Sequence, residues 1–249
     1  MIQLALITGG AVRIGKAIAL QMATNGYTIA IQYNHSENEV AETVETIRQA
    51  GGAAASFRAS LADPAQVEAL IPAIAGALGP LTCLVNNASH FADDRLPLLT
   101  ADGWRSHMAV NLDAPVFLSQ AFASQLPAEA EGNIVNIIDQ RVLRPNPQFF
   151  SYTLSKSAVW AATKTMAQAL APQIRVNAIG PGPALRSVYQ SKDDFEAECR
   201  ATPLRHGTTP EEIASTVLFI LRTPAMTGQM IALDGGQHLL WQTPDIRVT

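Results

Sequence analysis

The feature that most constrains the fold is a repeated alternation of short apolar runs with longer segments of helical periodicity. Apolar runs predict strands at residues 2–8, 27–33, 53–59, 81–87, 132–139, 174–180 and within 228–236. Helical spacing predicts helices at 13–26, 36–50, 63–79, 101–125, 149–171 and 211–221. The strands lack period-two alternation, which is typical of a parallel sheet covered on both faces. We therefore predict a doubly wound α/β fold, one domain over residues 1–249, with ligands at the carboxyl ends of the strands.

The composition disfavours several classes of protein. The 249 residues carry a formal net charge of −4, which disfavours a nucleic-acid partner. No apolar stretch reaches the roughly 18 residues of a membrane span, and the N-terminal segment has the pattern of a strand rather than a signal peptide. Cys83 and Cys199 are too few for a disulfide framework or a metal site, so we expect a buried thiol at Cys83 and no metal. A cytoplasmic protein acting on a small molecule is the expectation.

The segment "TGGAVRIG" lies between the first strand and the first helix, with Gly9 and Gly15 bracketing the turn. A glycine turn entering a helix offers free N–H groups and the positive dipole end to an anion. The spacing departs from G-x-G-x-x-G, but strand, glycine turn and helix follow in the required order. The alternative is a tight turn made for packing alone.

The end of the second strand bears on which anion binds. Residues 32–34 carry no negative charge, whereas a carboxylate there is usual for an unphosphorylated ribose. His35 and Ser36 can donate hydrogen bonds, and Arg13 lies inside the glycine turn. Together they favour a ribose with a 2′-phosphate; the alternative is that Arg13 and His35 are simply solvated.

An acid, a phenol and an amine follow the fifth strand. Tyr152 and Lys156 are four residues apart and share one helix face. A nearby ammonium is expected to lower the pKa of the phenol, which can then exchange a proton with a substrate. Asp139 ends a strand at the edge where ligands bind, or else caps the following loop. Asn111, inside the long helix, holds a water, positions Lys156, or is a satisfied buried amide.

These motifs, with "NNAS" (86–89), "SYTLSK" and "IRVNAIGPG", together resemble the short-chain dehydrogenase/reductase family over nearly the whole chain. The resemblance implies a seven-stranded Rossmann sheet, a nicotinamide cofactor and a homotetramer. It also implies Tyr152 as the acid/base, Lys156 on the nicotinamide ribose and Asn111 in a proton relay. The expected cofactor contacts are Gly9, Arg13, Ile14, Gly15, Asn34, His35, Ser36, Leu61, Asn87, Ala88, Tyr152, Lys156, Pro181 and Gly182.

Two departures from the usual family pattern are informative. Asp139 stands where a serine is normal, and Arg13 stands where a third glycine is common. Both are similar to the pteridine reductase branch, which includes dihydromonapterin reductase. The resemblance implies that Phe91 stacks on a pterin ring and that Arg13, Ser89, Asp139 and Tyr152 also bind it. The alternative for Phe91 is an exposed loop aromatic or a core filler.

The leading hypothesis is NADPH-dependent reduction of a dihydropterin or dihydrofolate, with NADP(H) as cofactor and Tyr152, Asp139 and Lys156 delivering the proton. One alternative is a carbonyl or imine reductase acting on another substrate. Another is a non-catalytic NADP(H)-sensing protein, which the presence of both Tyr152 and Lys156 disfavours. The irregular region at about 180–209 is expected to form a substrate loop. Arg141 and Arg144 are candidates for binding a folate glutamate tail, or are solvated.

Overall fold

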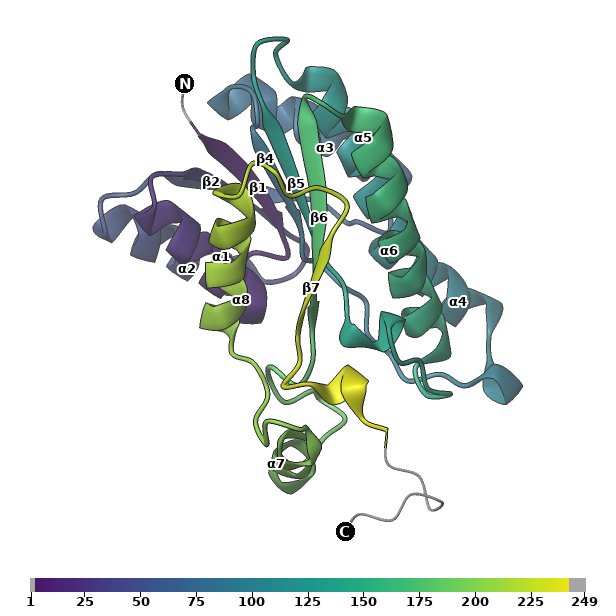
Figure 1. The fold of residues 1–249 in the computed structure, drawn as a ribbon. Coiled ribbons are helices and arrows are strands. Elements are labelled where there is room, and N and C mark those ends of the chain that lie inside the picture. The colour runs from purple at the N-terminus through teal and green to yellow at the C-terminus, as the bar shows by residue number, and fades with distance from the viewer. Residues whose placement is uncertain (1–2, 242–249) are drawn as a thin grey trace.

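All the strands form one parallel sheet in a computed structural model that describes residues 3–241. They are β1 (Leu4–Thr8), β2 (Thr28–Tyr33), β3 (Ala54–Arg58), β4 (Cys83–Asn86), β5 (Gly132–Ile137), β6 (Ile174–Pro181) and β7 (Met230–Leu233). Their spatial order is β3-β2-β1-β4-β5-β6-β7, so the seven-stranded prediction is confirmed (Figure 1). The order reverses between β1 and β4, which opens a crevice there at the carboxyl ends of the strands. Ile2 of the predicted first strand lies outside the described residues.

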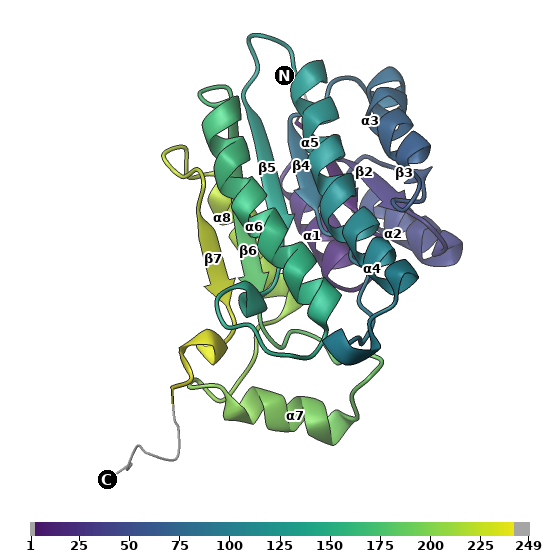
Figure 2. The ribbon, with the colours of Figure 1, turned by 90° about the vertical axis from the view of Figure 1, so that its right-hand side faces the viewer.

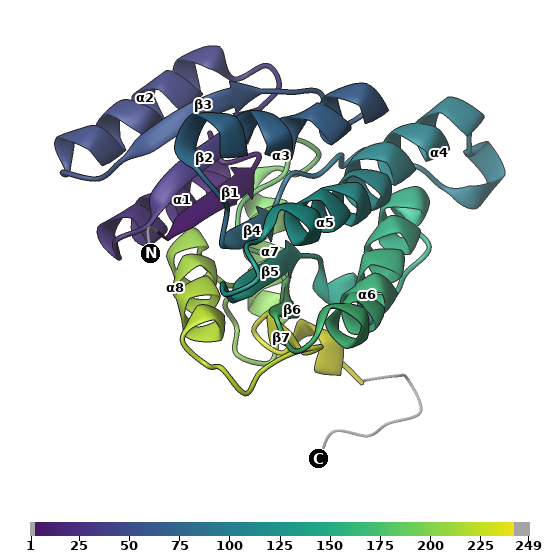
Figure 3. The same cartoon turned by 90° about the horizontal axis from the view of Figure 1, so that it is seen from above.

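Helices cover both faces of this sheet, as predicted (Figure 3). On one face lie α1 (Arg13–Thr24), α2 (Glu37–Gln49) and α8 (Pro210–Leu221); on the other lie α3 (Pro64–Leu78), α5 (Ala114–Gln125) and α6 (Phe150–Leu170). The predicted single helix at 101–125 is instead α4 (Ala101–Met108), a π-helical turn (Ala109–Asp113) and α5.

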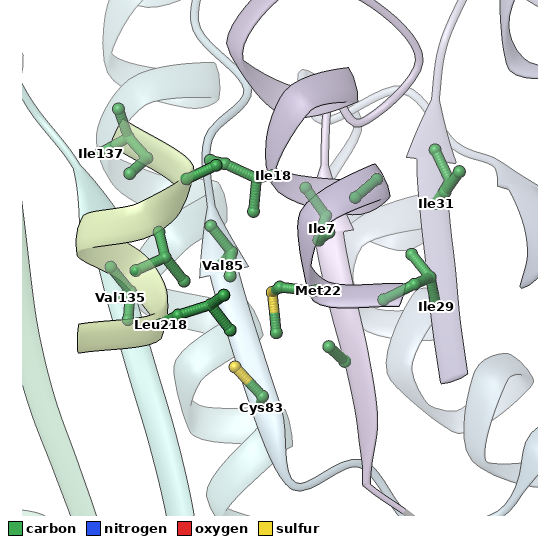
Figure 4. Packing of buried hydrophobic residues seen from close by; sticks show 14 of the residues in the cluster. Ile7, Ile18, Met22, Ile29, Ile31, Cys83, Val85, Val135, Ile137 and Leu218 are labelled. Atoms are coloured by element: carbon green, nitrogen blue, oxygen red, sulfur yellow. The ribbon is translucent and has the colours of Figure 1, made fainter. Parts of the chain in front are cut away.

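Alternate residues of each central strand enter different cores. In β1, Ala5 and Ile7 pack towards α1, whereas Leu4 and Leu6 pack towards the other helix layer. Both sets are buried, which is why the strand is apolar without alternation. Figure 4 shows Met22 of α1 among the side chains of the first core. Truncating such a fully buried side chain to alanine costs about 2–5 kcal/mol of stability. Cys83 is buried in this core as a free thiol, as expected.

Capping residues fix where the helices begin. In α8, the Thr209 hydroxyl accepts from the Glu212 amide, and the Glu212 carboxylate accepts from the Thr209 amide. Pro210 occupies the first turn. Ser36 stands at the N-cap position of α2, but its hydroxyl makes no capping hydrogen bond.

The region at about 180–209 is less irregular than predicted. It contains α7 (Lys192–Ala201), which starts with a capping box between Ser191 and Asp194. Figure 2 shows α7 crossing the end of the sheet where the strands finish. The irregular region predicted there is therefore partly helical. Within residues 3–241, none of the helices combines the length and hydropathy needed to span a bilayer.

Candidate active site

A cavity of about 1090 Å³ lies at the carboxyl edge of the sheet, where the crevice is expected. It brings together most of the predicted site residues: Gly9, Arg13, Ile14, Gly15, Asn34, Leu61, Asn87, Ala88, Ser89, Phe91, Asp139, Tyr152 and Gly182. Five further predicted residues, all described by the structure, do not line it: His35, Ser36, Asn111, Lys156 and Pro181. Residues far apart in the sequence therefore converge on one hollow.

The glycine turn packs too tightly for side chains. A Cβ on Gly15 would lie 2.2 Å from the Gly9 carbonyl oxygen, and Gly9 itself has φ of 61°. The Gly9 amide donates to the Gln32 side chain at 2.9 Å, which fixes the turn against β2. Helix α1 has no side-chain cap at Val12 and no acidic residue in its first turn. Its N-terminal amides therefore suit a phosphate group facing the cavity.

Asn87 and Ala88 lock the end of β4 to this turn. Both backbone amides donate to the Thr8 hydroxyl, at 2.9 and 3.0 Å. The Asn87 side chain donates to the carbonyls of Thr8 and Gly9. The two residues therefore shape the cofactor end of the cavity through the backbone as well as lining it.

Arg13 contacts the segment that follows β6. It adopts a left-handed conformation with φ of 53°, and its guanidinium donates to the carbonyls of Leu185 and Arg186 at 3.2–3.3 Å. In this structure Arg13 therefore ties the glycine turn to residues 185–186. His35, by contrast, is exposed and lies outside the cavity lining.

The acid and the phenol meet in the cavity. The Tyr152 hydroxyl donates to Asp139 Oδ2 at 2.9 Å, and the other carboxylate oxygen accepts from the Arg141 amide at 2.8 Å. The two readings of Asp139, catalytic partner and loop cap, thus both describe its contacts. Lys156 is buried beside them: its Nζ lies 5.7 Å from the Tyr152 ring centroid and donates to the Ile137 carbonyl at 2.9 Å.

Burial governs the protonation of this cluster. It raises the pKa of Asp139, and burial together with the Asp139 charge raises the pKa of Tyr152 well above its ordinary value. Burial lowers the pKa of Lys156 to about 8, partly opposed by Asp139. The expected lowering of the Tyr152 pKa by Lys156 is therefore wrong in direction, because burial and the Asp139 carboxylate both favour the protonated phenol. Tyr152 keeps its proton at neutral pH.

Asn111 is a satisfied buried amide. Its oxygen accepts from the Ser89 hydroxyl and the His90 amide, and its nitrogen donates to the His90 carbonyl and the Ser155 hydroxyl. Throughout the described chain it makes no hydrogen bond to Lys156, so direct positioning of Lys156 is not its role. It lies in the π-helical turn, a feature often found at functional sites. Through these bonds it holds residues 89–90 against α6.

Phe91 belongs to an aromatic cluster rather than to an exposed loop. It stacks on Phe149 with centroids 4.3 Å apart and planes at 12°, and meets Tyr152 edge-on at 4.8 Å. Tyr189 lies about 6 Å from both phenylalanine rings. Stacking of a flat ligand on Phe91 therefore uses the face away from Phe149, or requires Phe149 to move.

Two contributors were not predicted from the sequence. Phe149 lacks any local signal, because its stacking on Phe91 depends on where two distant loops meet. Asp94 caps α6 from outside the helix: its carboxylate accepts from the Ser151 amide at 3.0 Å and its carbonyl from the Phe150 amide at 3.2 Å. Asp94 and Ser151 are 57 positions apart, so their contact could not be predicted from local sequence spacing.

The chain is similar to known proteins over nearly its whole length. A family profile described as "Enoyl-(Acyl carrier protein) reductase" matches residues 10–238. The chain is 32% identical over 244 residues to the 3-oxoacyl-[acyl-carrier-protein] reductase FabG of Staphylococcus aureus strain N315, covering 96% of this chain and 99% of that protein.

Solved structures show a second likeness. FolM alternative dihydrofolate reductase 1 from Brucella canis, complexed with NADP, superposes with a TM-score of 0.95 at 47% identity, covering 98% of this chain and 97% of that one. Its counterpart from Brucella suis, also with NADP, gives 0.95 at 48% identity and 98% coverage of both chains. The chain belongs to the short-chain dehydrogenase/reductase family of oxidoreductases.

Proposed function

We propose that the protein uses NADPH to reduce a dihydropteridine such as a dihydropterin or dihydrofolate. The observation that carries the proposal is the Tyr152–Asp139 hydrogen bond of 2.9 Å, placed beside Phe91 in the main cavity. A stacking surface next to an acid pair suits a flat heterocycle whose ring nitrogen needs a proton. The two Brucella dihydrofolate reductases are similar to this chain over almost its whole length.

The cavity fits the proposed cofactor at its glycine end. The uncapped N-terminus of α1 suits the pyrophosphate, and no carboxylate among residues 32–36 would repel a 2′-phosphate. Asn34 and Arg13 line the cavity at this end and are the proposed contacts for that phosphate. Bound NADPH would supply the hydride. NADP in both Brucella structures supports this choice.

The proton steps follow from the protonation of the side chains. Tyr152 retains its proton because burial and Asp139 raise its pKa, so it can donate as hydride reaches the adjacent carbon. Asp139 accepts the bond from Tyr152. After Tyr152 has given up its proton, Asp139 can take a proton from solvent and pass it to the Tyr152 oxygen, since burial raises the pKa of Asp139. Lys156, held by the Ile137 carbonyl below the ring, is the proposed ribose contact and adds positive charge beneath Tyr152.

A second candidate is reduction of a β-ketoacyl thioester. The FabG relatives favour it, because they match 96% of this chain at 32% identity. Asp139 disfavours it: a carbonyl oxygen is best met by a neutral donor such as serine, whereas a carboxylate repels developing negative charge.

A substrate panel separates the two candidates. Initial rates are measured with dihydrobiopterin, dihydrofolate and an acetoacetyl thioester, each with NADPH and NADH. The proposal predicts a higher kcat/KM for the dihydropteridines and a preference for NADPH. Turnover of the thioester alone would contradict the proposal and establish the second candidate.

The proposal includes a homotetramer in the cytoplasm. The tetramer is supported by exposed aromatic and aliphatic side chains on the helices: Phe117 of α5, Leu154 of α6 and Phe219 of α8. Light scattering after gel filtration should give the mass of four chains, and a monomer mass would reject this part.

A further inference from the structure

A second, smaller hollow of about 500 Å³ adjoins the main cavity. The two share three lining residues, Arg95, Asn146 and Gln148, so the hollow continues the cavity outward. Its remaining lining is apolar and consists of Leu96, Pro97, Pro147 and Phe150. It lies between the loop that carries Phe91 and the loop that follows Asp139. A ligand stacked on Phe91 therefore has a direct route into it.

Arg95 is the cation at the junction. Its side chain is exposed and, within residues 3–241, makes no ion pair or hydrogen bond. Arg141 also lines the main cavity, but its guanidinium lies 5.1 Å over the Phe149 ring and donates to Asn146. Asp93 lines the main cavity but not the hollow. Arg95 is therefore the one charged residue among those that line the hollow.

Arg144 does not have the role considered for it from the sequence. Its guanidinium donates to the Gln237 carbonyl at 3.3 Å, and it lines neither the cavity nor the hollow. Of the two arginines considered there, only Arg141 reaches the cavity. The available cation beside the apolar wall is Arg95.

We propose that this hollow is a tail subsite: an aryl group carried by the pterin packs on Leu96, Pro97 and Phe150, and an anionic group beyond it binds Arg95. The inference rests on the proposed function, since it places the tail of the same substrate. Continuity with the cavity and the charge of Arg95 both favour an aryl-carboxylate tail over a short polar one. Dihydrofolate carries such a tail and dihydrobiopterin does not.

The test compares these two substrates in matched variants. Arg95→Gln should raise KM for dihydrofolate about fivefold, the effect of one exposed ion pair, and leave KM for dihydrobiopterin unchanged. Added salt should reduce the wild-type preference for dihydrofolate. Arg105→Gln is the control, since Arg105 is an exposed arginine on α4 outside both hollows.

Two leucines provide a matched pair of variants that tests the apolar wall of the hollow. Leu96 and Leu98 are exposed leucines of the same short 3₁₀ turn, but only Leu96 lines the hollow. Leu96→Ser should raise KM for dihydrofolate about threefold through lost apolar contact, and Leu98→Ser should not.

The outcomes separate the subsite from the reaction. Equal effects on both substrates, or none on dihydrofolate in Arg95→Gln, would overturn the subsite while leaving the reductase intact. Failure of the wild-type protein to reduce either dihydrobiopterin or dihydrofolate would instead contradict the proposed function.

Discussion

The two ends of the main cavity are built in different ways. At the glycine end, between β1 and α1, the chain presents backbone: Gly15 allows no Cβ and α1 leaves its first amides uncapped. At the other end the chain presents side chains: Tyr152 donates a hydrogen bond to Asp139 and meets the Phe91 ring edge-on. The glycine end depends on close approach of the backbone to a ligand, and the other end depends on the protonation of its side chains. Mutations should therefore affect binding at one end and proton transfer at the other.

The largest expected effect is at the side-chain end. Tyr152→Phe removes the proton donor but keeps the ring, so kcat should fall about 10²–10⁴-fold. NADPH affinity, measured by fluorescence titration, should change little. An unchanged kcat would remove Tyr152 from the proposed chemistry.

The glycine end should show the reverse pattern. Gly15→Ala places a Cβ 2.2 Å from the Gly9 carbonyl, so the turn must open and NADPH should bind roughly 100-fold more weakly, about 2.7 kcal/mol. Gly76→Ala is the control, because Gly76 lies within α3 with no atom within 4 Å of the added Cβ. It should stabilise the protein by about 0.5–1 kcal/mol and leave binding unchanged. Equal NADPH affinity in Gly15→Ala and Gly76→Ala would contradict the claim that cofactor binding at the glycine end depends on close approach of the backbone.

Asp139 tests whether burial is maintained for function. Folding raises the pKa of Asp139. Above this raised pKa, the ionised carboxylate lowers the stability of the folded state. As pH falls from the folded-state pKa to the unfolded-state pKa, Asp139 is protonated in the folded state and this loss of stability disappears. Asp139→Asn should therefore raise Tm at pH 7, with the gain shrinking in acid, while kcat falls about tenfold or more. It should also remove the limb of the pH–rate profile that reports this carboxyl. A lower Tm at pH 7 would contradict the account.

Asp94 should have the smallest effect on turnover. Asp94→Ala removes the external cap of α6, at about 1 kcal/mol, and loosens the first turn that carries Tyr152. We expect kcat to fall about tenfold and amide exchange at residues 149–153 to accelerate. Asp94→Asn keeps an acceptor and should restore most of both. Thr209→Ala, which uncaps α8 instead, should lower Tm similarly without reducing kcat.

What the sequence predicts well here is whatever is encoded locally. The strands of the sheet were predictable because both faces of each central strand are buried, as Leu6 and Ile7 illustrate. Asp139, Tyr152 and the glycine turn were predictable because strand ends meet at one edge of a parallel sheet. Their convergence on one cavity follows from that topology.

What remained hidden depends on contacts between distant segments. The π-helical turn at Asn111 is held by bonds to His90 and Ser155, which no helical period reveals. The stacking of Phe149 on Phe91 and the cap from Asp94 likewise join loops far apart in the chain. The pKa of Tyr152 was predicted in the wrong direction because the burial of the phenol and the Asp139 carboxylate bonded to it, which both raise this pKa, depend on tertiary packing.

The most direct measurement is a crystal structure of the protein with NADP and a dihydropteridine bound. The account predicts the heterocycle stacked on the Phe91 ring, with the Tyr152 hydroxyl still bonded to Asp139 and within about 3 Å of a ring nitrogen or a bridging water. A heterocycle bound away from Phe91, with Asp139 and Tyr152 facing none of its ring nitrogens, would contradict it.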